Sequence, residues 1–216
     1  MRKFCIFLLA AIMILSLAAC GNSPSSSGGA NNNQDSAETR VIIDSVGREV
    51  EIPRTIKSIV CVNVGALRYT CYMQAQDLVV GVEDYEQQPT LSRLYNYVNF
   101  DKFSALPVIG TNGEHYPEAI VEIAPDIIIM TAAAKDEADA LQSKTNIPVI
   151  AVPGSDSTLD EGAYETIRIM GEVYGKEDRA RELIAYMDGI KTDLDSRTAN
   201  IPQADKPTVY VGGVSY

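Results

Sequence analysis

The side chains best suited to bind a small molecule stand in short polar segments that follow apolar runs. Amide, phenol, imidazole and guanidinium groups are all present there. They supply hydrogen bonds, aromatic surface, a potential metal ligand and a fixed positive charge. The candidate ligand-binding residues are Asn63, Arg68, Tyr85, His115 and Tyr116. This set favours binding chemistry.

Motifs for catalysis are missing from the sequence. It contains no G-x-S-x-G, no G-x-x-x-x-G-K-[ST], no C-x-x-C and no H-E-x-x-H pattern. An enzyme needs a nucleophile with its base, or converging acid and base groups. The single histidine disfavours a histidine-rich zinc or manganese site unless another lobe supplies ligands. We therefore expect no catalytic residues, no metal site and no enzymatic activity.

The segments around these side chains alternate between strand and helix patterns. Short apolar runs predict strands, and three-four apolar spacing predicts helices. The predicted strands are Ile59–Asn63, Leu78–Val82, Pro107–Ile109, Ile127–Met130 and Pro148–Val152. The predicted helices are Ala66–Gln74, Leu91–Val98, a short one opened by Pro117, and Lys135–Lys144. This alternation predicts an α/β fold with a parallel sheet.

The sheet topology predicts where a ligand would bind. In parallel sheets, ligands collect beyond the carboxyl ends of the strands. That rule selects four loops, Asn63–Ala66, Glu83–Gln88, Thr111–Tyr116 and Ala132–Ala134. Just beyond the first loop, Arg68 could neutralise an anionic complex such as a ferric catecholate.

Four of the five candidates also have a purely structural interpretation. Asn63 can satisfy backbone groups at the strand end, and Arg68 can pair with a surface carboxylate. His115 can be a solvated or capping residue in its polar loop. Tyr116 can pack as a hydrophobic lid before Pro117. The sequence leaves these alternatives open.

The first residues have the features of a secretory signal. Arg2 and Lys3 precede an apolar run, Phe4–Leu15, that is shorter than the roughly 20 residues of a membrane-spanning helix. The sequence Leu17-Ala18-Ala19-Cys20 resembles the lipobox of bacterial lipoproteins. We expect a signal peptide over residues 1–19, lipidation of Cys20, and anchoring at the extracytoplasmic face of the cell membrane. Ordinary secretion with an incidental cysteine is the alternative.

Residues 20–39 are predicted to form a flexible tether. They are rich in Ser, Gly and Asn and contain no large apolar residue, so they cannot bury enough surface to fold. Without Arg2 and Lys3, the formal net charge changes from −11 to −13. This acidic balance argues against nucleic acid as a partner.

The two cysteines of the folded part are Cys61, in a predicted strand, and Cys71, in the helix that follows it. They could pair if the helix packs back on its strand. We expect two buried thiols instead. Their ten-residue spacing matches no metal motif.

Further elements flank the alternating region. Val41–Ile52 reads as a hairpin with a turn at Gly47. Asp160–Tyr174 and Lys176–Thr198 are predicted helices, and the second spans roughly 30–35 Å. Thr208–Gly212 is a predicted strand.

The order of these motifs resembles the substrate-binding lipoproteins of ABC importers for ferric siderophores, haem and cobalamin. The resemblance rests on VIIDSVGREVEIPRTIKSIVCVNVGALRY, DLVVGVEDYE and LPVIGTNGEHYPEAIVEIAPDIIIM. It implies two α/β lobes joined by a rigid helix, with ligand held between them. Residues 40–158 would be the N-terminal lobe and 159–199 the helical linker. Residues 200–216 would begin a C-terminal lobe that is otherwise missing.

The resemblance also assigns a role to Glu118. In relatives, an acidic residue at this helix start meets arginines on the transporter's membrane subunits. The alternative is a first-turn carboxylate stabilised by the helix dipole, worth about 0.3–1 kcal/mol.

The implied function is capture of an iron complex, with a ferric siderophore as the first candidate, and its delivery to an ABC transporter permease dimer. Haem and cobalamin are alternative ligands, and no resident cofactor is expected. A surface adhesin or sensor module on the same fold is the other class. Tyr116 stands where many relatives carry Asn, and Arg68 where many carry an acidic residue. These two departures can reflect the ligand.

Overall fold

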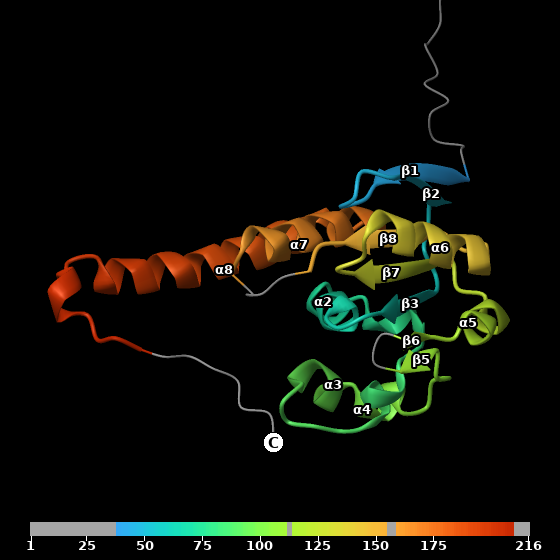
Figure 1. Ribbon diagram of the computed structural model, residues 1–216, viewed down its shortest axis with the longest axis horizontal. Helices are drawn as coiled ribbons and strands as arrows, with labels where there is room; N and C mark the ends of the chain where they lie inside the picture. Colours follow the sequence, from blue (N-terminus) through green and yellow to red (C-terminus); the bar gives the residue numbers. More distant parts are fainter. Residues whose placement is uncertain (1–37, 112–113, 155–158, 210–216) are drawn as a thin grey trace, which may run out of the picture. The chain divides into compact units, whose positions relative to one another are not determined.

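The computed structural model describes residues 38–111, 114–154 and 159–209 (Figure 1). The predicted signal peptide, Cys20 and the tether up to residue 37 lie outside the described residues. The predicted strand Thr208–Gly212 lies outside them from Tyr210 onward, and its first two residues have no regular secondary structure.

A four-stranded parallel sheet organises the described part of the chain. Its strands are β3 (Ile59–Val62), β4 (Val79–Gly81), β7 (Ile127–Thr131) and β8 (Val149–Val152), in the spatial order β4-β3-β7-β8. The predicted α/β fold with a parallel sheet is confirmed.

Both faces of the sheet are buried. All described residues of β3, β7 and β8 are buried, and successive side chains enter two different apolar clusters. Ile59, Ile127 and Ile150 enter one cluster, and their neighbours Val60, Ile128 and Val149 enter the other. This is the period-two alternation of a sheet covered on both sides, and it explains why the strands are continuously apolar.

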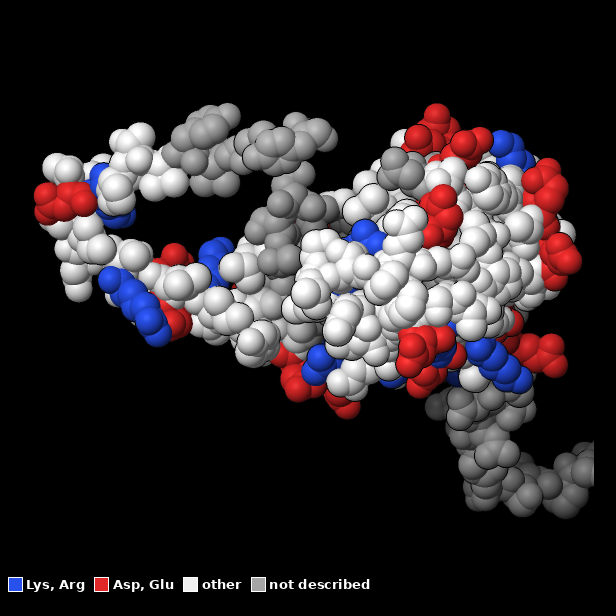
Figure 2. All heavy atoms as spheres, turned by 90° about the horizontal axis from the view of Figure 1, so that it is seen from below, with Lys and Arg blue, Asp and Glu red and all other residues white. Residues whose placement is uncertain are grey.

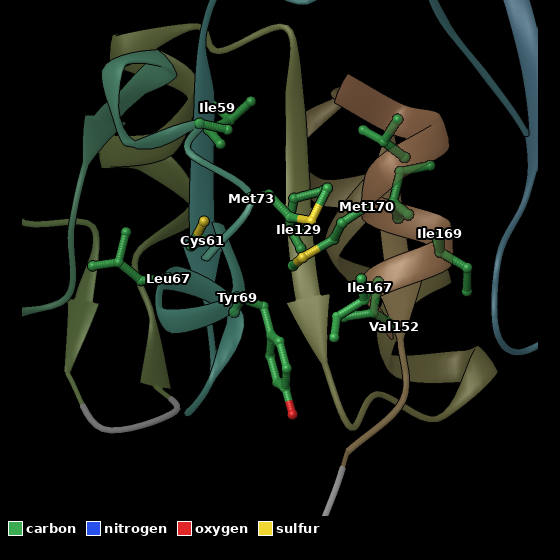
Figure 3. Close-up of a cluster of buried hydrophobic side chains, with 14 of the residues drawn as sticks. Ile59, Cys61, Leu67, Tyr69, Met73, Ile129, Val152, Ile167, Ile169 and Met170 are labelled. Carbon is green, nitrogen blue, oxygen red and sulfur yellow. The ribbon is translucent and has the colours of Figure 1, made fainter. Parts of the chain in front are cut away.

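Helices supply the two covering layers. On one face lie α2 (Ala66–Tyr72) and α7 (Glu161–Tyr174), whose buried side chains surround Ile129 and its neighbours (Figure 3). On the other face lie α5 (Pro117–Ile123) and α6 (Lys135–Thr145). Pro117 occupies the first turn of α5, as predicted, where its missing N–H costs nothing.

The predicted N-terminal hairpin is confirmed as β1 (Thr39–Ile43) and β2 (Glu49–Pro53). Its turn covers the free edge of β8. The Ser45 amide donates to the Ala151 carbonyl at 3.1 Å, and the Asp44 carboxylate accepts from the Ala151 amide at 3.2 Å. Asp44 also forms a buried ion pair with Arg48. The edge strand is therefore closed to further pairing.

The segment between β4 and β7 is less regular than predicted. The 3₁₀ helices η2 (Gln76–Leu78) and η3 (Asp84–Gln87) flank β4, and the short helices α3 (Leu94–Val98) and α4 (Phe100–Phe103) follow. The predicted helix at Leu91 begins three residues later. The Thr90 hydroxyl accepts from the Ser92 amide, which competes with helical hydrogen bonding.

Two further predictions in this segment need correction. Pro107–Ile109 is not a strand but a single bridge between Val82 and Val108, because Pro107 has no amide to donate. The predicted polar loop that follows contains a small hairpin, β5 (Gly110–Thr111) and β6 (Glu114–His115).

The long helix α8 (Glu177–Thr198) packs along α7, with Gly175 in the left-handed conformation between them. A Cβ on Gly171 of α7 would lie 2.7 Å from the Cβ of Ala180, so glycine is required for this close packing. From Asp188 onward every residue of α8 is exposed. A last 3₁₀ turn, η4, spans Gln203–Asp205. Among the described residues, none of the helices has the length and apolar character of a membrane span.

The glycine contact gives a stability prediction. Gly171→Ala should lower the free energy of unfolding relative to Gly189→Ala by about 1–3 kcal/mol, because the added methyl group overlaps Ala180. Gly189 lies in α8 with no described atom near its Cβ position, so alanine there should stabilise the helix by about 0.5–1 kcal/mol. Urea denaturation of both variants measures the difference. Equal stabilisation by the two substitutions would show that the helices do not pack closely at Gly171.

Candidate functional site

The candidate site lies where the chain leaves β3 and β7 toward opposite faces of the sheet. After β3 it enters α2 on one face, and after β7 it enters α6 on the other. Asn63 and Ala132, the residues directly after these strands, both have left-handed backbones, with φ of 67° and 55°. A crevice at such a switch point is the usual ligand site of an open α/β sheet.

Asn63 ties the two strand ends together. Its side-chain amide donates to the Thr131 carbonyl at 2.8 Å. Asn63 therefore has the structural role predicted for it, which is to satisfy a backbone group at a strand end. Asn63 also lines a groove between α5 and α6, so a ligand in that groove could contact it as well.

Two grooves flank the β3–α2 turn. The α2–α3 groove has a volume of about 790 Å³, within the usual range of small-molecule sites. The α5–α6 groove has a volume of about 390 Å³. The first is lined by Val64, Gly65, Arg68, Cys71, Tyr72, Gln74, Gln76, Ser92, Arg93, Leu94, Tyr95, Val98 and Asn99. The second is lined by Asn63, Glu114, His115, Pro117, Met130, Glu137, Ala140, Leu141 and Lys144.

Arg68 supplies positive charge to the α2–α3 groove. Its guanidinium carbon lies 5.1 Å from the centre of the Tyr69 ring, and one terminal nitrogen lies over Gly65. Its Nε is buried and makes no hydrogen bond, and within the described part of the chain no carboxylate pairs with it. The predicted alternative, a surface ion pair, is thus not formed among these residues.

Arg93, the second cation of this groove, was not among the predicted site residues. Unlike Arg68, it is held by the protein. It donates to the Tyr85 carbonyl at 2.6 Å, and its Nε lies 3.7 Å from the Glu86 carboxylate. Its guanidinium also covers the Tyr85 ring, with 5.2 Å between the guanidinium carbon and the ring centre.

A buried carboxylate, Glu86, anchors the wall of this groove. It accepts from the Tyr95 hydroxyl at 2.6 Å and from the Asn96 amide at 2.8 Å. Burial raises the pKa of Glu86, and the hydrogen bond from Tyr95 partly opposes this. No periodicity marks these residues in the sequence, so only the fold reveals that they fix α3 against η3.

Tyr85 lines neither groove. Its ring lies under Arg93, and burial raises the pKa of its hydroxyl, with the nearby Glu83 and Glu86 carboxylates acting in the same direction. The structure gives Tyr85 a packing position behind the groove wall. Its predicted ligand contact stays a prediction.

His115 lines the α5–α6 groove, away from Arg68. The ring is half-buried, and its Nδ1 is buried without a described hydrogen-bond partner. Burial lowers the pKa of His115, whereas the carboxylates Glu83 and Glu137 raise it. At neutral pH the imidazole is therefore mainly uncharged, with a buried nitrogen available for a hydrogen bond.

Tyr116 and Glu118 lie at the start of α5. Tyr116 is 39% exposed and lines neither groove, while its backbone amide donates to Ile109. Glu118 is exposed in the first turn, and within the described residues it has no ion-pair partner. It is thus accessible to a partner and favourably placed for the helix dipole.

Cys61 and Cys71 are both free thiols, and of the two only Cys61 is fully buried as expected. Cys61 is buried, and its Sγ lies 3.3 Å from the Thr70 hydroxyl, while Cys71 is partly buried. Burial raises the pKa of both thiols to about 12, so neither is reactive as a thiolate at neutral pH. Among the described residues, no cluster of three His, Cys, Asp or Glu side chains could hold a metal ion.

Comparison with known proteins identifies the type of fold. A family model described as periplasmic binding protein matches residues 59–215. The petrobactin-binding protein YclQ of Bacillus subtilis is 23% identical over 195 residues, covering 90% of this chain and 58% of YclQ. The Fe(3+)-citrate-binding protein YfmC of the same organism is 26% identical over 208 residues, covering 94% and 62%. The chain thus spans about three-fifths of the length of these curated relatives.

Solved structures share this fold. The molybdate-bound MolA of Haemophilus influenzae superposes with a TM-score of 0.64 at 22% identity, covering 77% of this chain and 56% of MolA. The crystal structure of YclQ gives a TM-score of 0.60 at 21% identity, covering 76% and 55%. At these identities the similarity establishes the α/β architecture.

Because the sequence contains one histidine, the titration of His115 can be followed without overlap from other imidazole signals. We expect the imidazole NMR signals of His115 to titrate with a midpoint below 6.5, because burial disfavours the imidazolium. The folded pKa is lowered, so the stability contributed by the neutral ring is complete above pH 6.5 and is lost as pH falls through the folded pKa. His115→Gln should remove both the signals and this part of the pH dependence. A midpoint at or above 6.5 would mean that the ring is not desolvated.

Proposed function

The chain belongs to the periplasmic binding protein family, and we propose that the full-length protein captures an iron complex and delivers it to an ABC transporter permease dimer. The observation that carries the proposal is the family match over the same strands whose carboxyl ends form the switch-point crevice. A ferric siderophore is the proposed ligand class. Haem and cobalamin remain alternatives, as does a surface adhesin or sensor module.

The ligand class is supported by the named relatives and by the site. Relatives are named for petrobactin and for ferric citrate. The switch-point region offers a cation in Arg68, an amide in Asn63 and a largely neutral imidazole in His115. Arg68 in the α2–α3 groove, and Asn63 and His115 in the α5–α6 groove, can each contact oxygen atoms of an anionic complex. The family consists of binding proteins, and we propose that this chain likewise performs no catalysis.

The N-terminal region supports an extracytoplasmic location. Two relatives are named lipoproteins, YvrC and YfiY of Bacillus subtilis. We propose that Cys20 carries the lipid anchor and that residues 20–39 tether the binding domain to the outer face of the membrane. Several acyl chains anchor a protein firmly, whereas one chain binds only marginally.

Ligand titration of the full-length protein tests the proposed function. Ferric siderophores, haemin, cobalamin and molybdate are added separately while tyrosine fluorescence is followed. Saturable binding of a ferric siderophore, with no binding of molybdate, is the expected result. Molybdate is included because the relative MolA, 24% identical over 186 residues, is named for that anion. Binding of molybdate alone would overturn the iron assignment.

The proposed docking role of Glu118 is tested separately from ligand binding. Glu118→Arg in the full-length protein should abolish iron uptake by cells and leave ligand affinity unchanged, because it reverses the exposed charge offered to the permease. Glu177→Arg, an equal charge change in the first turn of α8, is the matched control and should leave uptake intact. A loss of affinity that parallels the loss of uptake would contradict docking by Glu118.

A further inference from the structure

We propose that the α2–α3 groove selects anionic iron chelates that carry an apolar flank, with Arg68 binding the charge and α3 binding the flank. The inference rests on the proposed function and narrows its ligand class.

The groove has a strongly apolar rim. Val64, Leu94 and Val98 line it and remain 70%, 64% and 74% exposed. Leu94 and Val98 are four residues apart on α3, so they share one face of the helix. Figure 2, seen from the side where α3 and α4 lie, shows mostly uncharged side chains across this face. Contiguous exposed apolar side chains around a groove are typical of a binding site.

The charge of the groove is purely positive. Its lining includes Arg68 and Arg93 and no carboxylate. The Nε of each arginine is buried without a hydrogen bond, but the two cations differ in availability. Arg93 donates to the Tyr85 carbonyl and pairs with Glu86, whereas Arg68 makes no hydrogen bond or ion pair within the described residues. A buried donor without an acceptor is unfavourable, so an anionic oxygen at Arg68 would remove an existing cost.

The wall that carries the apolar rim is rigidly supported. The Glu86 carboxylate accepts hydrogen bonds from the Tyr95 hydroxyl and the Asn96 side-chain amide. The Asn99 side-chain amide donates to the Tyr95 carbonyl at 2.7 Å. α3 is therefore held against η3 although it has only five residues, and the Asn99 amide at its end also donates to the Cys71 sulfur of α2 at 4.0 Å. Preorganised walls lower the cost of binding a ligand.

Charge and apolar surface together define the ligand. A bare oxyanion such as molybdate would use Arg68 but leave the apolar rim in water. Ferric citrate is anionic but has little apolar surface. An anionic chelate with aromatic groups would satisfy Arg68 and cover Leu94 and Val98, and a groove of about 790 Å³ has room for such a molecule.

Binding measurements on the full-length protein test this selectivity with three probes. These are the ferric complexes of 2,3-dihydroxybenzoate and of citrate, and molybdate. We expect the aromatic chelate to bind most tightly. Arg68→Gln should weaken binding of both iron complexes by about tenfold or more, the usual effect of losing a charged hydrogen bond. Leu94→Gln should weaken the aromatic chelate severalfold and leave ferric citrate unchanged.

Two matched control variants test whether the loss of affinity is specific to substitutions in the groove. Tyr97→Gln makes an apolar residue of α3 polar outside the groove, and Arg181→Gln removes an exposed arginine from α8. Neither variant should change the affinity for the aromatic ferric chelate or for ferric citrate. If the wild type binds iron complexes but Arg68→Gln and Leu94→Gln behave like the controls, the groove assignment is wrong and the proposed function stands. If the wild type binds neither iron complex, the groove assignment and the proposed function are both wrong.

Discussion

Burial of the sheet on both faces is the constraint on which the rest of the structure depends. Strands β3, β7 and β8 expose no side chain, so each must be covered twice. Covering both faces forces the chain to leave β3 and β7 in opposite directions, and this creates the crevice at their carboxyl ends. Asn63 spans that crevice by binding the Thr131 carbonyl. The site is therefore a consequence of how the core is packed.

Helix α2 connects the core, the α2–α3 groove and the long helix α8. Its buried face carries Tyr69, and Met73 directly after the helix also lies in the core, while Arg68 lines the groove. At its other end, Arg179 donates to the Tyr72 carbonyl at 3.0 Å, and Lys176 donates to the Gln74 carbonyl at 2.6 Å. Cations on these terminal carbonyls stabilise the end of α2. Helix α8 and the groove are thus both in contact with this one short helix.

Much of the fold could be predicted because its signals are local. The apolar runs of the strands, Pro117 at a helix start and Gly175 at a helix end each act within a few residues. The prediction was wrong at Pro107–Ile109 and at the start of α3, where proline and the Thr90 hydroxyl compete with regular structure. The candidate site was predicted only as a set of strand-end loops, since its division into two grooves depends on how distant helices pack.

The sequence by itself determined the α/β class, the hairpin at the N-terminal side of the sheet, and the choice of side chains beyond the strand ends, because periodicity and turn residues are properties of neighbours along the chain. Only the tertiary structure decided that Arg68 has no carboxylate partner among the described residues while Arg93 has one, and that Glu86 is buried behind the groove. The tertiary structure also decided that position 171 must be glycine, because the Ala180 methyl group packs against it. Each of these facts is a contact between segments far apart in the sequence, and residue spacing carries no record of such contacts.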